Sequence, residues 1–190
     1  MQTFTSSLST NAHYLRVLVM GGPGSGTSTL GRALAKMINA RHLETDDYQW
    51  QQDPQGHAVF QIKTDLVHRA QALVRDLQYS GPIVVSGSLD GWGSSVEDNF
   101  DLVVFLVLDT RLRLQRIRER DAHQFGKVDQ VFLEWAAGYD DGNRPGRSRA
   151  SHEKWLAARS QPLLRIQGDL SLEAQLEKVL QALAAITQTT

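Results

Sequence analysis

Short, continuous runs of apolar residues alternate along this chain with longer segments in which apolar residues recur every three or four positions. The short runs predict buried strands over residues 15–20, 83–86, 102–108 and 163–166, and residues 42–45 are predicted as a short second strand. The longer segments predict helices over residues 27–38, 64–79, 111–120, 131–136, 151–159 and 172–186. Apolar strands separated by helices are typical of a parallel sheet covered on both faces. We therefore expect one α/β domain over residues 14–190, with a five-stranded parallel sheet between helices, after a flexible terminus over residues 1–13.

Polar and glycine-rich segments follow the predicted strands, at the edge of the sheet where ligands of parallel α/β proteins bind. Residues 21–26 follow the first strand, Asp46 and Asp47 follow the second, residues 86–92 follow the third, and Asp109 ends the fourth. A polar stretch around residues 53–56 predicts a loop or small flap before the next helix. The sequence thus gathers its candidate chemistry at one edge of the predicted sheet.

Composition excludes several kinds of function. The chain has 190 residues, of which 41% are hydrophobic and 22% charged, as is ordinary for a globular protein. A net charge of −1 gives no general attraction to nucleic acid or to an anionic membrane, and no apolar run is long enough to span a bilayer. We expect a cytoplasmic protein that binds neither. The absence of Cys excludes disulfides, thiolate catalysis and cysteine zinc sites, and the six His residues show no metal-ligand spacing, so no role is assigned to them.

The segment VLVMGGPGSGTSTL over residues 17–30 carries the most specific signal in the chain. Its spacing Gly21-x-x-x-x-Gly26-x-Ser28 fits the Walker A pattern, G-x-x-x-x-G-K-[ST], and lies between a strand and a helix as that pattern requires. Backbone N–H groups of such a loop and the positive end of the helix dipole bind phosphates, and the Ser28 hydroxyl takes the position of the Mg²⁺ ligand. The predicted phosphate-binding residues are Gly21, Gly22, Gly24, Ser25, Gly26, Thr27, Ser28 and Thr29. The alternative is a glycine-containing turn that binds nothing.

Thr27 occupies the position at which the pattern has Lys. That Lys contacts the β- and γ-phosphates, and loss of one such preorganised charge typically costs about 2.7–4 kcal/mol of activation barrier. Either another cation replaces it, or the protein binds nucleotide without rapid turnover.

From about Tyr14 to Ala185 the chain resembles the small P-loop kinases, a group that includes adenylate, shikimate, gluconate and nucleoside kinases. It is most similar to bacterial adenylate kinase-like, AAA-annotated proteins that carry GSGTSTL, TDDY and GSLxGWG segments, all of which occur here. The resemblance implies ATP and Mg²⁺ as cofactors. It also implies a helical lid over roughly residues 120–150 and a small-molecule acceptor such as a nucleoside, nucleotide or hydroxylated metabolite.

The resemblance also implies roles for the carboxylates after the second strand. Glu44-Thr45-Asp46 falls where shikimate kinases carry an Asp-x-Asp motif that serves metal and acceptor, and Asp46-Asp47-Tyr48 resembles the Asp-Asp-aromatic segment of uridine-type kinases. Asp46 and Asp47 are therefore candidate catalytic residues that orient or deprotonate the acceptor, and Asp46 is a candidate Mg²⁺ ligand. The alternative is that the two residues cap the next helix or face solvent.

Arginines are the remaining candidate catalytic residues. Arg116 and Arg120 repeat the R-x-x-x-R spacing found where adenylate kinase-type chains enter the lid, and they share one helix face. They are expected to bind phosphate or adenine, the alternative being a solvated basic face paired with neighbouring acids. Arg144 and Arg147, with Arg149, lie in the predicted lid, where one of them would supply the charge that Thr27 lacks.

Three further segments carry weaker expectations. Residues 86–88 match a turn that contacts the acceptor in shikimate-type enzymes, and Trp92 is expected either to stack on a substrate or to join the core. Asp109 is expected to cap the basic helix, and the backbone at Gly168 and Asp169 to pass under adenine.

Three functions remain open at this stage. The first is an ATP-dependent kinase that acts on a small acceptor. The second is a nucleotide-binding regulatory protein with weak hydrolysis at best. The third is a P-loop fold that acts through a partner without binding nucleotide.

Overall fold

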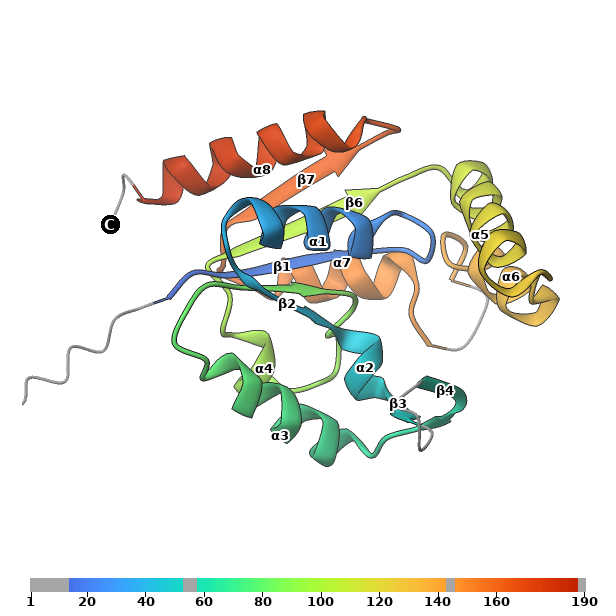
Figure 1. Cartoon of the computed structure of the whole chain (residues 1–190), viewed down its shortest axis with the longest axis horizontal. Helices are drawn as coiled ribbons and strands as arrows, with labels where there is room; N and C mark the ends of the chain where they lie inside the picture. Colours follow the sequence, from blue (N-terminus) through green and yellow to red (C-terminus); the bar gives the residue numbers. More distant parts are fainter. Residues whose placement is uncertain (1–13, 53–57, 143–145, 188–190) are drawn as a thin grey trace, which may run out of the picture.

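A five-stranded parallel sheet forms the centre of the protein, with helices on both faces (Figure 1). The computed structural model describes residues 14–52, 58–142 and 146–187. The strands are β1 (Arg16–Gly21), β2 (Arg41–Glu44), β5 (Ile83–Ser86), β6 (Leu102–Val107) and β7 (Leu163–Gln167), in the spatial order β2-β5-β1-β6-β7. All their pairings are parallel, which confirms the predicted sheet.

Each face of the sheet buries its own apolar cluster. On one face, residues of β1, β5 and β6 pack against α3 (Leu66–Leu77), α4 (Ser94–Glu97) and α7 (Arg149–Ala157). On the other face, alternate residues of the same strands pack against α1 (Thr27–Met37) and α8 (Leu172–Thr187). Side chains of β1 and β5 are buried on both faces, which explains the continuous apolar runs over residues 17–20 and 83–85.

The connections contain three features that the sequence prediction did not include. Asp46 and Asp47 lie in a short helix, α2 (Thr45–Gln49). A hairpin of β3 (Trp50–Gln52) and β4 (Ala58–Lys63) follows α2, and the loop or flap predicted around residues 53–56 lies outside the described chain. The short helix α4 was not predicted, because its four residues are too few to show a helical period.

The segment predicted as a lid contains the end of α5 (Thr110–Phe125), all of α6 (Gln130–Ala137) and the approach to α7. Figure 1 shows α5 and α6 side by side, beyond the carboxyl end of β6. Asp109 is the N-cap of α5 and accepts a hydrogen bond from the backbone N–H of Arg111 at 2.8 Å, which confirms its predicted capping role. Trp92 is 4% exposed and belongs to the core. Within the described residues, no helix has the length and apolar character needed to cross a membrane.

Candidate functional site

The glycine-rich segment forms a compact loop between β1 and α1. Gly24 and Gly26 have φ angles of 78° and 98°, which residues with a Cβ rarely adopt, and the N–H of Ser25 donates to the carbonyl of Gly22 at 3.1 Å. Gly26 is the N-cap of α1, so the N–H groups of the first helical turn face the loop. Gly21 ends β1, and the other seven predicted phosphate-binding residues lie in this loop and turn. Their backbone gives the geometry of an anion site without any contribution from a Lys.

Buried groups of the sheet hold the start of α1 in place. The Ser86 hydroxyl donates to the carbonyl of Thr27 at 3.2 Å and lies 2.9 Å from Nε2 of His42. Burial, with a smaller contribution from Arg32, lowers the pKa of His42 to about 4, so this imidazole is neutral at neutral pH. Ser86 is fully buried, so its side chain supports the start of α1, and contact of residues 86–88 with an acceptor stays a prediction.

The loop also packs closely against the segment that precedes α7. A Cβ on Gly22 would lie 2.6 Å from Cε1 of Tyr139, so only glycine fits under this ring. Arg113 stacks on the same ring, with its guanidinium carbon 4.9 Å from the centroid, and donates from Nη1 to the carbonyl of Pro23 at 3.0 Å. The same guanidinium donates to Asp140 Oδ2 at 2.6 Å, and Arg149 donates to Asp140 Oδ1 at 2.6 Å.

Arg113 was assigned no role from the sequence, yet this side chain is almost fully buried, with 1% of its surface exposed. A signal was available, because Arg113 stands four residues before Ile117 and so shares the buried face of α5. A charged residue at an apolar position of a helix marks a buried ion pair, which here is the pair with Asp140.

Ser28 meets a carboxylate at the mouth of the loop. Its hydroxyl donates to Oε2 of Glu44 at 3.0 Å, and Arg32 Nη1 lies 3.1 Å from Glu44 Oε1. Burial raises the pKa of Glu44 to about 7, against the lowering influence of the Ser28 hydrogen bond and of Arg32. The structure therefore places Glu44 against the predicted metal-binding serine, whereas the metal role of Asp46 stays a prediction.

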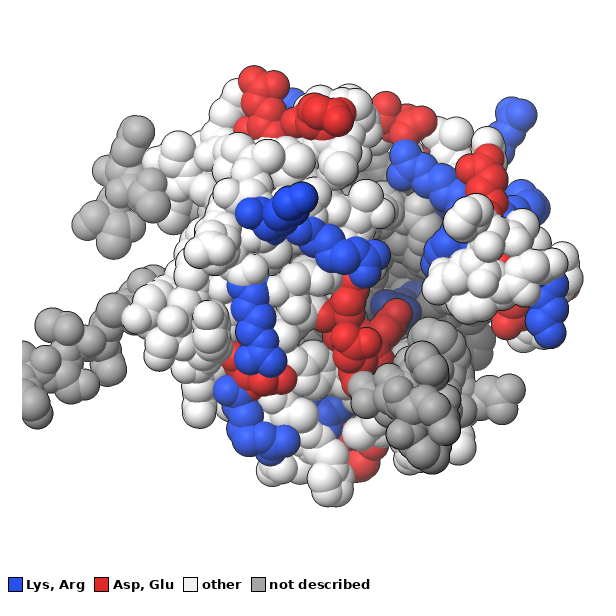
Figure 2. All heavy atoms as spheres, in the orientation of Figure 1, with Lys and Arg blue, Asp and Glu red and all other residues white. Residues whose placement is uncertain are grey.

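Asp46 and Asp47 follow Glu44 in the first turn of α2, and both are exposed. Burial at its inner side and the charge of Asp46 raise the pKa of Asp47. Figure 2 shows acidic side chains beside basic ones near the middle of this face, where Figure 1 has β2 and α2. The described side chains offer no cluster of three or more His, Cys, Asp or Glu that could hold a metal. A metal here therefore requires oxygen ligands from a bound phosphate as well, which is how Mg²⁺ usually binds.

The structure separates the predicted arginines. Arg116 lies over the phosphate loop, where its Nη1 is 3.4 Å from the carbonyl of Ser25, and it pairs with Asp169 after β7. Arg120 turns away to Asp121, with its Nη2 2.7 Å from Oδ1, and lies over the Phe132 ring at 5.8 Å.

The lid arginines also have different surroundings. Arg147 stacks on Trp135 at 5.6 Å, and Arg149 is engaged by Asp140. Arg144 lies outside the described residues. Of the predicted catalytic arginines whose positions are described, Arg116 is therefore the one that the structure brings onto the loop.

A buried polar chain runs behind the site. His152, which is fully buried, has its Nδ1 2.8 Å from Oη of Tyr139 and its Nε2 2.7 Å from Oγ of Ser88. The Ser88 hydroxyl donates in turn to Asp90. Sequence reasoning had assigned no role to any His, because this chain joins residues that are far apart in sequence.

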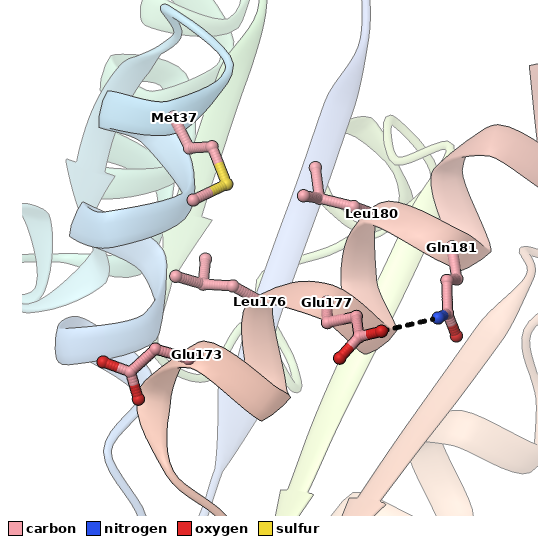
Figure 3. A pocket seen from close by; sticks show the side chains of 6 residues that line it. All are labelled: Met37, Glu173, Leu176, Glu177, Leu180 and Gln181. Atoms are coloured by element: carbon pink, nitrogen blue, oxygen red, sulfur yellow. Dashed lines mark hydrogen bonds between the residues drawn. The ribbon is translucent and has the colours of Figure 1, made fainter.

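An apolar groove of about 330 Å³ lies elsewhere, at the carboxyl-terminal end of α1 and away from the phosphate loop (Figure 3). Its lining includes Met37, Leu176 and Leu180, and no residue of the loop. We therefore assign it no part in the site.

Comparisons with known proteins agree with this geometry. The family model AAA_18, described as an AAA domain, matches residues 17–130. The chain is 38% identical over 177 residues to the uncharacterized protein YqaC of Bacillus subtilis (strain 168), which covers 88% of this chain and 96% of that protein.

Solved kinases share the fold. A shikimate kinase from Bacteroides thetaiotaomicron has a TM-score of 0.60 at 17% identity and covers 90% of this chain and 98% of its own. A gluconokinase from Sinorhizobium meliloti 1021 has a TM-score of 0.57 at 17% identity, over 93% and 95% of the two chains. A deoxyadenosine kinase from M. mycoides has a TM-score of 0.53 at 14% identity, over 90% and 100%. The predicted fold of the small P-loop kinases is thereby confirmed, while the acceptors of these enzymes differ from one another.

Proposed function

The chain belongs to the AAA_18 family of AAA domains, and from this premise we propose that it is an ATP-dependent phosphotransferase that acts on a small acceptor. The observation that carries the proposal is the 3.0 Å hydrogen bond between Ser28 and Glu44 at the mouth of a fully formed phosphate loop. A turn that merely joins a strand to a helix has no need of a carboxylate at this position. The fold of the solved kinases supports the proposal.

The oxygen atoms at this point suit Mg²⁺. Oε1 of Glu44 is buried and has no well-directed hydrogen-bond donor, although Arg32 lies nearby, and the Ser28 hydroxyl is adjacent. Ser28 and Glu44 would hold the cation together with phosphate oxygens, and a bound cation favours the ionised form of Glu44. Mg²⁺ supplies charge neutralisation on the β- and γ-phosphates.

In the proposed reaction, an acceptor hydroxyl attacks the γ-phosphorus of ATP while the bond from that phosphorus to the β,γ-bridging oxygen breaks and ADP leaves. The acceptor proton passes to a carboxylate of α2. Asp47 suits this role because its raised pKa makes it a better base than an ordinary Asp, and Asp46 suits orientation of the acceptor. The start of α2 and the turn after β5 lie beside the phosphate loop, so they form the acceptor side of the site.

Arg116 is proposed as the cation that compensates for Thr27. Its guanidinium already lies over Ser25, and its bond with Asp169 is exposed enough to exchange for a phosphate or a base. Such a rearrangement costs little, since exposed ion pairs contribute only about 0–1 kcal/mol.

Thr27 itself favours a second candidate function, that of a nucleotide-binding regulatory protein with weak hydrolysis. The two functions share the phosphate loop and differ in phosphoryl transfer. A transfer assay separates them, because only the kinase moves the γ-phosphate to an acceptor other than water.

The test begins with calorimetric titration of the protein with Mg·ATP. We expect micromolar affinity that is lost in Gly26→Val, whose side chain cannot adopt the left-handed backbone. Ser28→Ala should weaken only the part of the ATP affinity that depends on Mg²⁺. Ser95→Ala on α4 is the matched serine control. Transfer of phosphate from ATP radiolabelled at the γ-position is then measured with a panel of nucleosides, nucleotides, sugars and hydroxy acids as acceptors. Absence of binding up to millimolar Mg·ATP contradicts both candidate functions.

A further inference from the structure

His152 connects two loops of the site that are distant in sequence. Tyr139, at one end of the connection, packs its ring against Gly22 of the phosphate loop. Ser88 and Asp90, at the other end, belong to the turn after β5. His152, Tyr139 and Ser88 are 0%, 3% and 2% exposed, so water does not replace these contacts.

The hydrogen bonds of this connection run in one direction. Ser88 gives its proton to the Asp90 carboxylate, so its oxygen accepts a hydrogen bond from Nε2–H of His152. The imidazole tautomer that fits this direction has an unprotonated Nδ1, which accepts from the hydroxyl of Tyr139, and burial raises the pKa of Tyr139, so the hydroxyl keeps its proton. This assignment satisfies every donor and acceptor of the imidazole and fixes its tautomer.

Asp90 stands on the acceptor side of the proposed kinase. β5 lies between β2 and β1, so the turn after it lies between α2 and the phosphate loop. A Cβ on Gly87 would lie 1.9 Å from the hydroxyl of Thr45, which shows how closely this turn meets the start of α2. The side chain of Asp90 is 21% exposed, in contrast to the buried groups behind it.

We propose that His152 is a positioning residue that holds Asp90 as an ionised carboxylate on the acceptor side, at a place fixed relative to the phosphate loop through Tyr139. The acceptor side is that of the proposed kinase, so this inference rests on the proposed function. An ionised carboxylate so placed accepts hydrogen bonds from hydroxyl groups of an acceptor.

The polar and charged groups that face Asp90 come from three elements. His152 is on α7, Arg147 precedes α7, and Arg69 is on α3, where it stacks on Trp92 at 4.7 Å. Burial alone raises the pKa of Asp90, but Nε2–H of His152 at 3.6 Å, the hydrogen bond from Ser88 and the charge of Arg147 outweigh it and lower the pKa. Removal of the Nε2–H donor of His152 therefore raises the pKa of Asp90, whereas better hydration after a loss of packing would lower it.

Two substitutions of His152 separate its two contacts. The amide of Asn reaches about as far as Nδ1, and the amide of Gln about as far as Nε2. We expect His152→Asn to lose the hydrogen bond to Ser88 and to raise the titration midpoint of Asp90 by roughly one pH unit. His152→Gln keeps a donor for Ser88, and Asp90 should then titrate as in the wild type. Carboxyl ¹³C NMR follows Asp90, assigned through Asp90→Asn, and imidazole ¹⁵N NMR of the wild type should show the Nε2–H tautomer.

Equal Asp90 midpoints in the wild type and His152→Asn would overturn the inference, as would an Nδ1–H tautomer in the wild type. The ¹⁵N spectrum needs no variant, so the inference stays open to refutation if His152→Asn does not fold. The dissociation constant for Mg·ATP is measured on the same samples and should change less than about twofold, since the Tyr139 ring stays on Gly22. Failure of the wild type to bind Mg·ATP counts against the proposed function and leaves the Asp90 titration readable.

Discussion

Substitution of Arg113 by Met tests whether the phosphate loop is held by a buried ion pair. Met has an unbranched side chain and a high helix propensity, so α5 is retained while the guanidinium is lost. The carbonyl of Pro23 loses its donor at 3.0 Å, and Asp140 loses its partner at 2.6 Å. Because Arg113 is 1% exposed, water cannot fully replace these bonds.

The surroundings of Asp140 determine how much stability Arg113→Met should lose. Removal of one partner of a buried ion pair costs about 3–5 kcal/mol. Asp140 is 20% exposed and keeps hydrogen bonds from Thr110 and Arg149, so its charge is not left unpaired. We therefore expect the lower limit, about 3 kcal/mol of unfolding free energy, which is a large part of the roughly 5–15 kcal/mol that stabilises a typical protein.

Urea unfolding followed by circular dichroism measures this loss. With a slope of about 2–3 kcal/mol/M, the unfolding midpoint should fall by roughly 1 M urea with little change in slope. Arg118→Met on the same helix is the matched control, since Arg118 is exposed, and it should change stability by less than about 0.5 kcal/mol. Equal midpoints for the two variants would refute the reasoning. The affinity for Mg·ATP should fall in Arg113→Met alone, because its loop is no longer held at Pro23.

Three further predictions follow from the same contacts. Arg116→Met should lower phosphoryl transfer by about 10²–10³-fold, and Thr27→Lys added to that variant should restore most of it; transfer unchanged in Arg116→Met contradicts the proposed compensation. Gly22→Ala should cost about 1–3 kcal/mol in urea unfolding, because its Cβ would lie 2.6 Å from a Tyr139 ring that cannot move freely. Burial raises the pKa of Asp140, but hydrogen bonds from Thr110 and Arg113 bring it below the ordinary 3.8, so this carboxylate stabilises the fold above about pH 4 and loses that effect as the pH falls through its folded pKa. The loss of stability below pH 4 should therefore be shallower in Asp140→Asn, and parallel acid curves would contradict this assignment.

The fold was predictable because its signals are local. The central strands carry apolar runs, residues 17–20 in β1, 83–85 in β5 and 102–107 in β6, and α1 follows a glycine whose left-handed conformation the motif already requires. The same holds for Asp109, whose capping bond spans two residues. Patterns of this kind need no knowledge of which strands are neighbours.

The supports of the site were not predictable, because they depend on long-range contacts. His152 and Ser88 are 64 residues apart in sequence, and Arg113 and Pro23 are 90 apart. In the sequence each is an ordinary polar residue, and only the order of the strands brings its partner near. Glu44 was visible as part of a motif, yet its contact with Ser28 required the pairing of β2 with β5 and of β5 with β1.

The consequences of the missing Lys also divide into a local part, phosphate binding, and a long-range part, the charge needed for turnover. Phosphate binding by the loop comes from backbone N–H groups and the start of α1, which the substitution by Thr27 leaves intact. The charge that the Lys would supply acts mainly as the reaction proceeds, and a cation from elsewhere in the fold can provide it. Arg116, which reaches the loop from α5, meets that requirement only when α5 is held against the loop. Because Arg113 makes that attachment one turn earlier on the same helix, stability of the loop and turnover should decline together when Arg113 is lost, whereas loss of Arg116 should lower turnover alone.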